Sequence, residues 1–182
     1  DATQLSRSTM VVATSSNSAQ TPESAQIEQV WQWLEDVPDP EIPVVSVLDL
    51  GMIRDVQISA NIVTVDVAPT YSGCPATEVI EDSIVSFLRD KGVNDVTINR
   101  VLSPAWTTDW ITTSGREKLL AYGIVPPVHD SSKRVLLGKT VVKCPQCRSS
   151  HTSLVSEFGS TACKAAYKCE QCFEPFEYFK CI

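Results

Sequence analysis

The sequence predicts an α+β protein in which a small mixed α-β-β-α-β-α domain precedes a zinc-ribbon β domain. Two observations predict this class. Helical and strand periodicities alternate over residues 21–123, and two C-x-x-C pairs stand in residues 139–182. With 182 residues, of which 43% are hydrophobic, the chain is long enough for one ordinary domain and a small second unit.

We expect four segments along the chain. Residues 1–20 are rich in Ser, Thr, Ala and Gln without a sustained period, which predicts a disordered N-terminal segment. Residues 21–123 carry the mixed domain. The proline-containing stretch that opens residues 124–138 predicts a linker. Residues 139–182 are too few to rely on a hydrophobic core, so we expect a metal to hold this last segment together.

The mixed domain is predicted to begin with a helix. Thr21 suits the N-cap position and Pro22 the first helical position, and prolines at 38 and 40 end the helix. Its apolar residues recur at helical spacing on one face: Ile27, Val30, Trp31 and Leu34.

A proline-punctuated loop, "DPEIPVVSVLDLG", separates this helix from two predicted strands, Met52–Ser59 and Ile62–Ala68. The short link between the two strands predicts a hairpin. The remaining elements follow in order: a helix that ends at Lys91-Gly92, a third strand over Asp95–Val101, and a short helix near Ser114–Tyr122.

Four cysteines in two C-x-x-C pairs predict a structural zinc site. Two residues between paired cysteines let a tight turn direct both sulfurs at one ion, and tetrahedral zinc takes four such ligands. The ligands are Cys144, Cys147, Cys169 and Cys172. A closed four-cysteine site leaves no open position for a substrate, so we expect this zinc to fold the ribbon and to catalyse nothing.

Three further residues near these pairs need an explanation. His151 is expected on the surface, since the two pairs already supply four ligands. Cys163 and Cys181 are expected to be small buried hydrophobic residues. Alternatively, they replace one of the paired ligands or form a second thiol site.

Cys74 stands apart from the paired cysteines, in "PTYSGCPATEVI". It directly precedes Pro75 at the expected start of a helix, where free backbone N–H groups favour a thiolate and lower the thiol pKa. Cys74 is therefore a candidate functional thiol. The alternative, that it only caps and packs, fits the local pattern equally well.

Several residues are candidates to support this thiol. Asp39 and Asp49 lie in the proline-punctuated loop, where turn capping is the simpler explanation. Glu41 is harder to explain as a cap, and Thr70 is placed to bind the loop or a ligand. Residues 1–128 contain no histidine, so a Cys–His hydrolase dyad has no obvious base.

Composition narrows the classes of partner and the compartment. The formal net charge of −7 argues against nucleic acid or an anionic membrane as the main partner. The sequence shows neither an apolar stretch of about 20 residues nor a secretory signal pattern. Cysteines arranged as metal ligands are typical of a reducing compartment, so we expect a cytoplasmic protein.

Three stretches together carry a family resemblance: "DPEIPVVSVLDLGMI", "APTYSGCP" and "SPAWTTDWITTSGREKL". They resemble the SufT-like domain of iron–sulfur cluster assembly over roughly residues 27–120. In that family the cysteine matching Cys74 is the functional thiol, and the acidic residue matching Glu41 belongs to the signature. With the tail "CPQCRSSHTSLVSEFGSTACKAAYKCEQCFEPFEYFKC", nearly all of the ordered chain resembles the PaaD (PaaJ-type) family of the phenylacetyl-CoA epoxidase system.

This resemblance implies an accessory role in bacterial phenylacetate degradation. The leading hypothesis is a non-catalytic maturation factor in which Cys74 transiently binds iron or an iron–sulfur cluster, and in which the ribbon docks an oxygenase or reductase component. The alternative is a structural or regulatory subunit of the oxygenase complex. A thiol enzyme ranks lower, because no base and no second cysteine lie near Cys74 in sequence. A homodimer bridged through this thiol stays open.

Overall fold

The computed structural model describes residues 22–71, 73–127 and 141–180. The predicted N-terminal segment, most of the predicted linker and Cys181 therefore lie outside the described residues. The mixed domain contains α1 (Pro22–Leu34), β1 (Ile53–Ser59), β2 (Ile62–Val67), α2 (Thr77–Asp90), β3 (Asp95–Arg100), a 3₁₀ turn η1 (Thr108–Trp110) and α3 (Thr113–Ala121). Their order confirms the predicted α-β-β-α-β-α arrangement.

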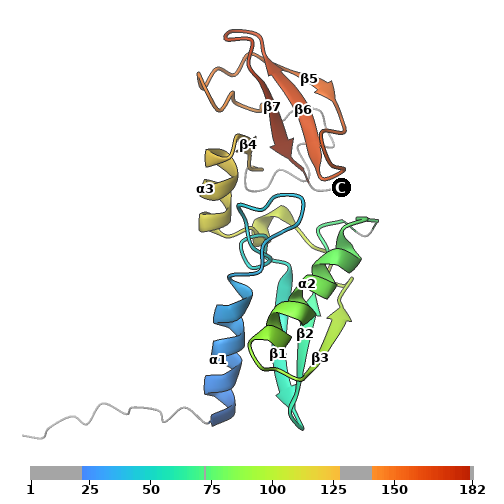
Figure 1. Cartoon of the computed structure of the whole chain (residues 1–182). Coiled ribbons are helices and arrows are strands. Elements are labelled where there is room, and N and C mark those ends of the chain that lie inside the picture. The colour runs from blue at the N-terminus through green and yellow to red at the C-terminus, as the bar shows by residue number, and fades with distance from the viewer. Residues whose placement is uncertain (1–21, 72, 128–140, 181–182) are drawn as a thin grey trace, which may run out of the picture.

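The sheet of the mixed domain has the strand order β1-β2-β3. β1 and β2 pair antiparallel as the predicted hairpin, and β3 lies parallel to β2. The hairpin turns at Ala60 and Asn61, both with positive φ, as in a two-residue type I′ turn. Figure 1 shows α1 and α2 lying against this sheet. Buried residues of both helices share one hydrophobic cluster with β2, whose Val65 and Val67 are fully buried.

The loop over residues 38–52 folds into a compact structure of its own. Pro38 and Ser46 form an isolated β-bridge, and the side chains of Ile42, Val47 and Leu50 are buried in the main core. The indole Nε1 of Trp106 donates a hydrogen bond to the Leu50 carbonyl at 2.9 Å. This anchoring fixes a loop that would otherwise expose several prolines and acids.

The C-terminal unit is a sheet with the strand order β4-β7-β6-β5. Its strands are β4 (Ile124–Val125), β5 (Thr152–Ser156), β6 (Lys164–Cys169) and β7 (Pro175–Phe179). β4 pairs parallel with β7, whereas β5, β6 and β7 pair antiparallel. The predicted linker is therefore wrong in its first two residues, because residues 124–125 supply the edge strand of this sheet. The remaining segment boundaries stay predictions.

The two units share one hydrophobic core. Ile124 of β4 and Phe179 of β7 belong to the same buried cluster as α1, α2 and β2, and Phe179 is only 1% exposed. A second, smaller cluster inside the ribbon contains Val142, Phe176 and Tyr178. In Figure 1 the end of β7 points toward the mixed domain, with α3 beside β4. The apolar surface buried between the units holds the ribbon against the mixed domain.

Among the described residues, no helix is long and apolar enough to cross a membrane.

Candidate functional site

A small pocket lies where the loop of residues 38–52, the start of α2 and the ribbon meet. It brings together the four predicted residues Asp39, Glu41, Thr70 and Cys74. The other side chains that line it are mainly apolar, and two of them come from the ribbon. They are Ile42, Leu50, Met52, Pro69, Thr77, Ile80, Cys163 and Phe179. The pocket is thus acidic and thiol-containing within an apolar surround.

Asp39 shapes the acidic side of the pocket. One of its carboxylate oxygens accepts hydrogen bonds from the backbone N–H groups of Glu41 at 2.9 Å and Ile42 at 2.8 Å. The capping predicted for Asp39 is therefore confirmed, and it fixes the backbone of the turn that carries Glu41. Burial raises the pKa of Asp39 despite these hydrogen bonds. Burial, and then repulsion from Asp39, raise the pKa of Glu41.

Cys74 lies in a turn before α2 rather than at its first residues. Its N–H donates to the Tyr71 carbonyl at 3.1 Å, and its own carbonyl accepts from the hydroxyl of Thr77 at 2.9 Å. The N-cap of α2 is Ala76. The side chain of Cys74 is half-buried and packs against the main core. The turn thus points the thiol at the core edge and the pocket.

The expectation that the helix start lowers the pKa of Cys74 is wrong. Burial raises the pKa of this thiol above its ordinary value, and the nearby charges of Glu41 and Asp39 raise it further. A hydrogen bond from the Ala76 backbone acts in the opposite direction and does not compensate. The field of the carboxylates and the loss of water therefore outweigh the partial positive charge of the helix end.

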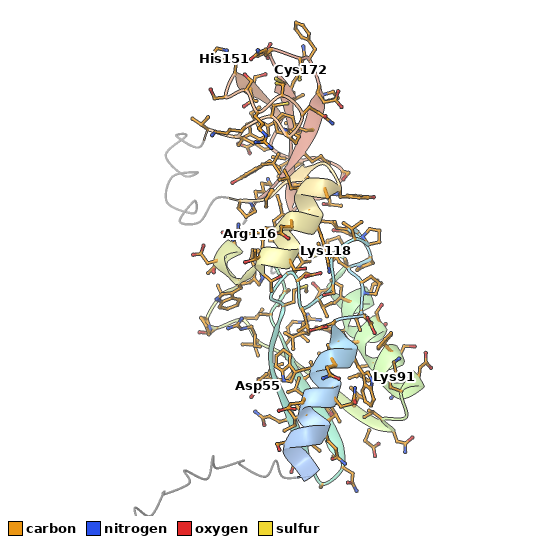
Figure 2. All side chains as sticks on the ribbon, turned by 90° about the vertical axis from the view of Figure 1, so that its left-hand side faces the viewer. Asp55, Lys91, Arg116, Lys118, His151 and Cys172 are labelled. Carbon is orange, nitrogen blue, oxygen red and sulfur yellow. The ribbon has the colours of Figure 1, made fainter. Side chains whose placement is uncertain are left out.

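Asp49, the other acid of the loop, is not part of the pocket. Its carboxylate accepts from the Ser46 N–H at 3.0 Å and forms an ion pair with Lys118 of α3 at 2.6 Å. It therefore caps the turn as predicted and ties the loop to α3. Figure 2 shows Lys118 and Arg116 on α3, between the ribbon and the lower part of the mixed domain.

The four paired cysteines converge at the other end of the ribbon. Their sulfur atoms all lie within 4.8 Å of one another: Cys144, Cys147, Cys169 and Cys172. The Sγ atoms of Cys144 and Cys172 are 3.6 Å apart, and those of Cys147 and Cys169 are 3.5 Å apart. Four sulfurs at about 2.3 Å from a tetrahedral zinc would be separated by about 3.8 Å. The donor set therefore fits a tetrahedral thiolate-bound metal.

Backbone geometry prepares both pairs for this arrangement. Arg148 and Phe173 directly follow the second cysteine of each pair, and both have positive φ, 60° and 63°. The Cys169 sulfur accepts hydrogen bonds from the backbone N–H groups of Gln171 at 3.4 Å and Cys172 at 3.5 Å. These tight turns bring the two sulfurs of each pair to one side, at the cost of an uncommon backbone conformation.

The crowding of four thiols shows in their acidity. Backbone hydrogen bonds from Cys172 and Gln171, and the neighbouring thiols, lower the pKa of Cys169 to about 6. The pKa of Cys172 is raised to about 12: a hydrogen bond from the Glu174 backbone lowers it, and burial and the other sulfurs outweigh this effect. Four thiols this close together cannot all ionise unless a bound cation stabilises the thiolates.

The four paired cysteines, called the tetrathiolate group below, form a site that is separate from the pocket. Cys163 directly precedes β6 and Cys169 is its last residue, so about 20 Å of extended strand lies between them. His151 is exposed, as predicted, and is not part of the tetrathiolate group. In Figure 2 both His151 and Cys172 lie at the end of the ribbon that is distant from α1.

Sequence reasoning missed two residues of the pocket. Cys163 was expected only as a buried residue, an alternative ribbon ligand or part of a second thiol site, and Phe179 was not a candidate site residue. Instead, Cys163 and Phe179 both line the pocket of Cys74. No local signal identifies them, because their position depends on how the ribbon packs against the mixed domain.

Comparison with known proteins agrees with this two-part structure. The profile of the PaaD zinc beta ribbon domain matches residues 128–180, and that of the iron-sulfur cluster assembly protein family matches residues 27–99. A 1,2-phenylacetyl-CoA epoxidase subunit from Escherichia coli (strain K12) is 49% identical over 157 residues, which cover 86% of this chain and 94% of that protein. The chain belongs to the PaaD family. The resemblance noted in the sequence is confirmed.

Two further relatives match the mixed domain of this PaaD-family chain. The Fe-S protein maturation auxiliary factor SufT of Staphylococcus aureus (strain USA300) is 32% identical over 78 residues, covering 42% of this chain and 88% of that protein. The crystal structure of a domain of unknown function, DUF59, from Bacillus anthracis superimposes with a TM-score of 0.50 and 26% identity. It covers 53% of this chain and 93% of the DUF59 chain.

Proposed function

We propose that this PaaD-family protein is a non-catalytic accessory factor of phenylacetate degradation that receives iron or an iron–sulfur cluster at Cys74 and delivers it to the phenylacetyl-CoA oxygenase/reductase system. The observation that carries the proposal is the pocket in which Cys74, Asp39 and Glu41 meet. The likeness to a component of an epoxidase and to a maturation auxiliary factor supports it.

The charges of the pocket suit a transient cation site. Without a cation, burial and then the charges of Glu41 and Asp39 raise the pKa of the Cys74 thiol and keep it protonated. A thiol in that state is a poor nucleophile and a poor target for oxidation. The same carboxylates attract a metal ion. The positive charge of the ion lowers the thiol pKa, so the proton leaves and the thiolate binds the ion. The Cys74 thiol is thus unreactive while the pocket is empty, and it binds as a thiolate once a cation enters.

The pocket does not support thiol catalysis. None of the residues that line it is a histidine, and the titratable groups beside Cys74 are acids that raise its pKa. Nucleophilic cysteine enzymes require an adjacent base or a lowered thiol pKa. These features favour binding over turnover.

In this proposal the tetrathiolate group holds a structural zinc. Its four sulfurs complete the coordination shell of the ion, and zinc there supplies only a crosslink between the two turns. The exposed apolar side chains of the ribbon then form the docking surface for a protein partner: Leu154, Val155, Phe158 and Phe173.

The proposal is tested with Cys74→Ala in cells that express the oxygenase and reductase components. The iron and cluster content of those components, and their epoxidase activity, are expected to fall at least severalfold. Ser83→Ala serves as the control, since the Ser83 hydroxyl bonds only to a carbonyl of its own helix. Unchanged metal content and activity with Cys74→Ala would overturn the maturation role.

A structural or regulatory subunit is the second candidate, favoured by the exposed apolar residues of the ribbon. It predicts that the protein co-purifies with the oxygenase in stoichiometric amount and that Cys74→Ala changes neither the complex nor its activity. Co-purification that depends on Phe158 and Phe173 but not on Cys74 distinguishes this candidate from the first.

A further inference from the structure

Two thiols from different parts of the chain line one pocket. Cys74 comes from the turn before α2, and Cys163 from the residue that precedes β6 of the ribbon. Both pack against the same buried cluster. Neither is close to the tetrathiolate group, whose four ligands are already complete. The pocket therefore holds a second group of thiols that the ribbon metal does not use.

Cys163 is held in place by its neighbours. Its carbonyl accepts the Lys180 N–H at 2.9 Å, and the Thr161 hydroxyl lies 3.1 Å from its sulfur. The next residue, Lys164, is 4% exposed and forms an ion pair with Glu177 at 3.3 Å. These contacts fix the start of β6, so the thiol faces the pocket in a defined position rather than as part of a mobile loop.

The two thiols share one electrostatic environment. Burial is the main cause that raises the pKa of Cys163, and the charges of Glu41 and Asp39 raise it as well. The same two carboxylates act on Cys74. The positive charge of Lys164 lowers the pKa of both Asp39 and Glu41, which favours their carboxylate forms. Two thiols and two carboxylates therefore surround a space of net negative charge.

The size of the space limits what it accepts. The pocket volume is about 10 Å³ for the centre of a water-sized sphere, which is about the room for one water molecule. A single metal ion fits such a space, whereas a cluster of several irons and sulfides does not. Beyond the ribbon cysteines, no three potential metal ligands of the described residues lie within 4.8 Å of one another. The pocket thus offers an incomplete set of ligands.

We propose that Cys74 and Cys163 together bind one thiophilic divalent cation, of the chemistry of Fe²⁺, in the pocket between the mixed domain and the ribbon. Asp39 and Glu41 supply the negative charge that attracts it. The proposal deepens the function proposed above by adding the second thiol and by choosing a single ion over a cluster. Because two protein thiolates leave other coordination positions open, a partner can bind the ion before this chain releases it.

This arrangement makes the ribbon part of the cation site. Cys163 reaches the pocket only while Phe179 and Ile124 keep the ribbon packed on the mixed domain. A partner that moves the ribbon would separate the two thiols and weaken binding of the ion. Docking at the exposed apolar surface of the ribbon is thereby linked to release of the cation.

The test is a titration of the reduced, zinc-loaded chain with Co²⁺ under oxygen-free conditions. Zinc binds such ligands more tightly than Co²⁺, so the ribbon keeps its metal. We expect one added Co²⁺ with a thiolate charge-transfer band. Cys163→Ser and Cys74→Ser should each weaken Co²⁺ binding by about tenfold or more and remove about half of the band. Cys181→Ser removes one thiol near the C-terminal end of the sequence and is the control for thiol number.

The outcomes are distinct. Equal Co²⁺ affinity and band intensity for Cys163→Ser and the unsubstituted chain overturn the proposal, as does an equal loss for Cys181→Ser. If Cys74→Ala abolishes maturation of the oxygenase while Cys163→Ser leaves Co²⁺ binding intact, the second-thiol site fails and the maturation role stands. If both thiols bind Co²⁺ but Cys74→Ala has no effect in cells, the cation site stands and the maturation role fails.

A second measurement needs no variant and covers the case that Cys163→Ser does not fold. Phenylarsine oxide reacts with two nearby thiols to form two As–S bonds and release one water. With the zinc-loaded chain, digestion and mass spectrometry are expected to find the peptides of Cys74 and Cys163 joined through one arsenic. A bridge between other cysteines only, or no bridge, contradicts the proposal.

Discussion

The ring of Phe179, from the last strand of the ribbon, packs edge-to-face against the ring of Trp106 in the mixed domain, with centroids 6.1 Å apart and planes at 64°. Trp106 in turn donates to the Leu50 carbonyl. The contact therefore joins the ribbon, the segment before α3 and the loop of residues 38–52, called the acidic loop below. Aromatic pairs of this geometry add stability beyond the area that they bury.

We predict that Phe179→Ala destabilises the whole chain. Removing a fully buried phenylalanine costs about 3–5 kcal/mol, because the transfer energy is lost and a cavity is left. Urea unfolding followed by tryptophan fluorescence measures the effect. Phe158→Ala is the matched control, since Phe158 is 62% exposed and its loss should cost less than about 1 kcal/mol. Equal losses for the two variants would contradict the shared core.

Gly51 closes the acidic loop in a conformation that a side chain does not tolerate. Its φ is +65°, and a Cβ atom would lie 2.2 Å from the carbonyl oxygen of Trp110. We predict that Gly51→Ala costs about 2–5 kcal/mol, the sum of backbone strain and overpacking. Gly92 also has a positive φ, +94°, but nothing lies within 4 Å of its added Cβ.

The pair Gly51→Ala and Gly92→Ala separates the two causes. Gly92→Ala carries only the backbone strain, so it is expected to cost about 1–2 kcal/mol. Thermal and urea unfolding of both variants measure the difference. If Gly92→Ala proved as costly as Gly51→Ala, the close approach of the loop to Trp110 would not be a source of the cost.

The features that the sequence predicted correctly are local. Alternating valines define β2, the apolar spacing of Ile80, Ile84 and Leu88 defines α2, and each C-x-x-C pair sits in a single turn. Asp39 was correctly expected to cap its turn, because an aspartate and the N–H groups that follow it are neighbours in sequence. Such features need no knowledge of the tertiary structure.

The features that the sequence could not predict depend on packing between distant segments. Cys163 lies next to the acidic loop only because residues 124–125 pair with β7 and Phe179 enters the main core. The pKa direction of Cys74 was wrong for the same reason. The helix end is visible in the sequence, whereas the burial and the carboxylates that outweigh it come from the loop that folds against the turn.

The tetrathiolate group leads to a prediction about metal content. We expect about one zinc per chain, and Cys144→Ser should abolish it, because a structural site with three thiolates binds the ion far more weakly. The melting temperature of the whole chain should fall too, since the ribbon contributes Phe179 to the main core. Elemental analysis and thermal unfolding check both effects.

His151→Ala is the control for this prediction, because His151 is exposed and lies outside the tetrathiolate group. Its zinc content and melting temperature are expected to equal those of the unsubstituted chain. Retention of zinc by Cys144→Ser, or loss of zinc by His151→Ala, would show that the four cysteines are not the ligand set.

The reactivity of Cys74 should depend on the charge of Glu41. Burial is the largest cause of the raised pKa of Cys74, and it persists in any conservative variant, but the Glu41 charge is the main electrostatic cause among those that raise it. Glu41→Gln keeps the shape of the side chain and removes the charge. The thiolate is then less disfavoured, so the pKa of Cys74 decreases.

The rate of alkylation of the Cys74 peptide by iodoacetamide, measured against pH in the zinc-loaded chain, reports this pKa. For the unsubstituted chain we expect the midpoint at a higher pH than for an ordinary cysteine thiol, since the pKa of Cys74 is raised, mainly by burial. For Glu41→Gln the midpoint moves to lower pH, and alkylation at pH 8 becomes faster. Glu81→Gln is the control, because Glu81 lies on α2 and pairs with Arg100 outside the pocket. The same midpoint for Glu41→Gln and Glu81→Gln would mean that Glu41 does not face the thiol, and the acidic pocket would then lose its role in keeping Cys74 protonated until a cation arrives.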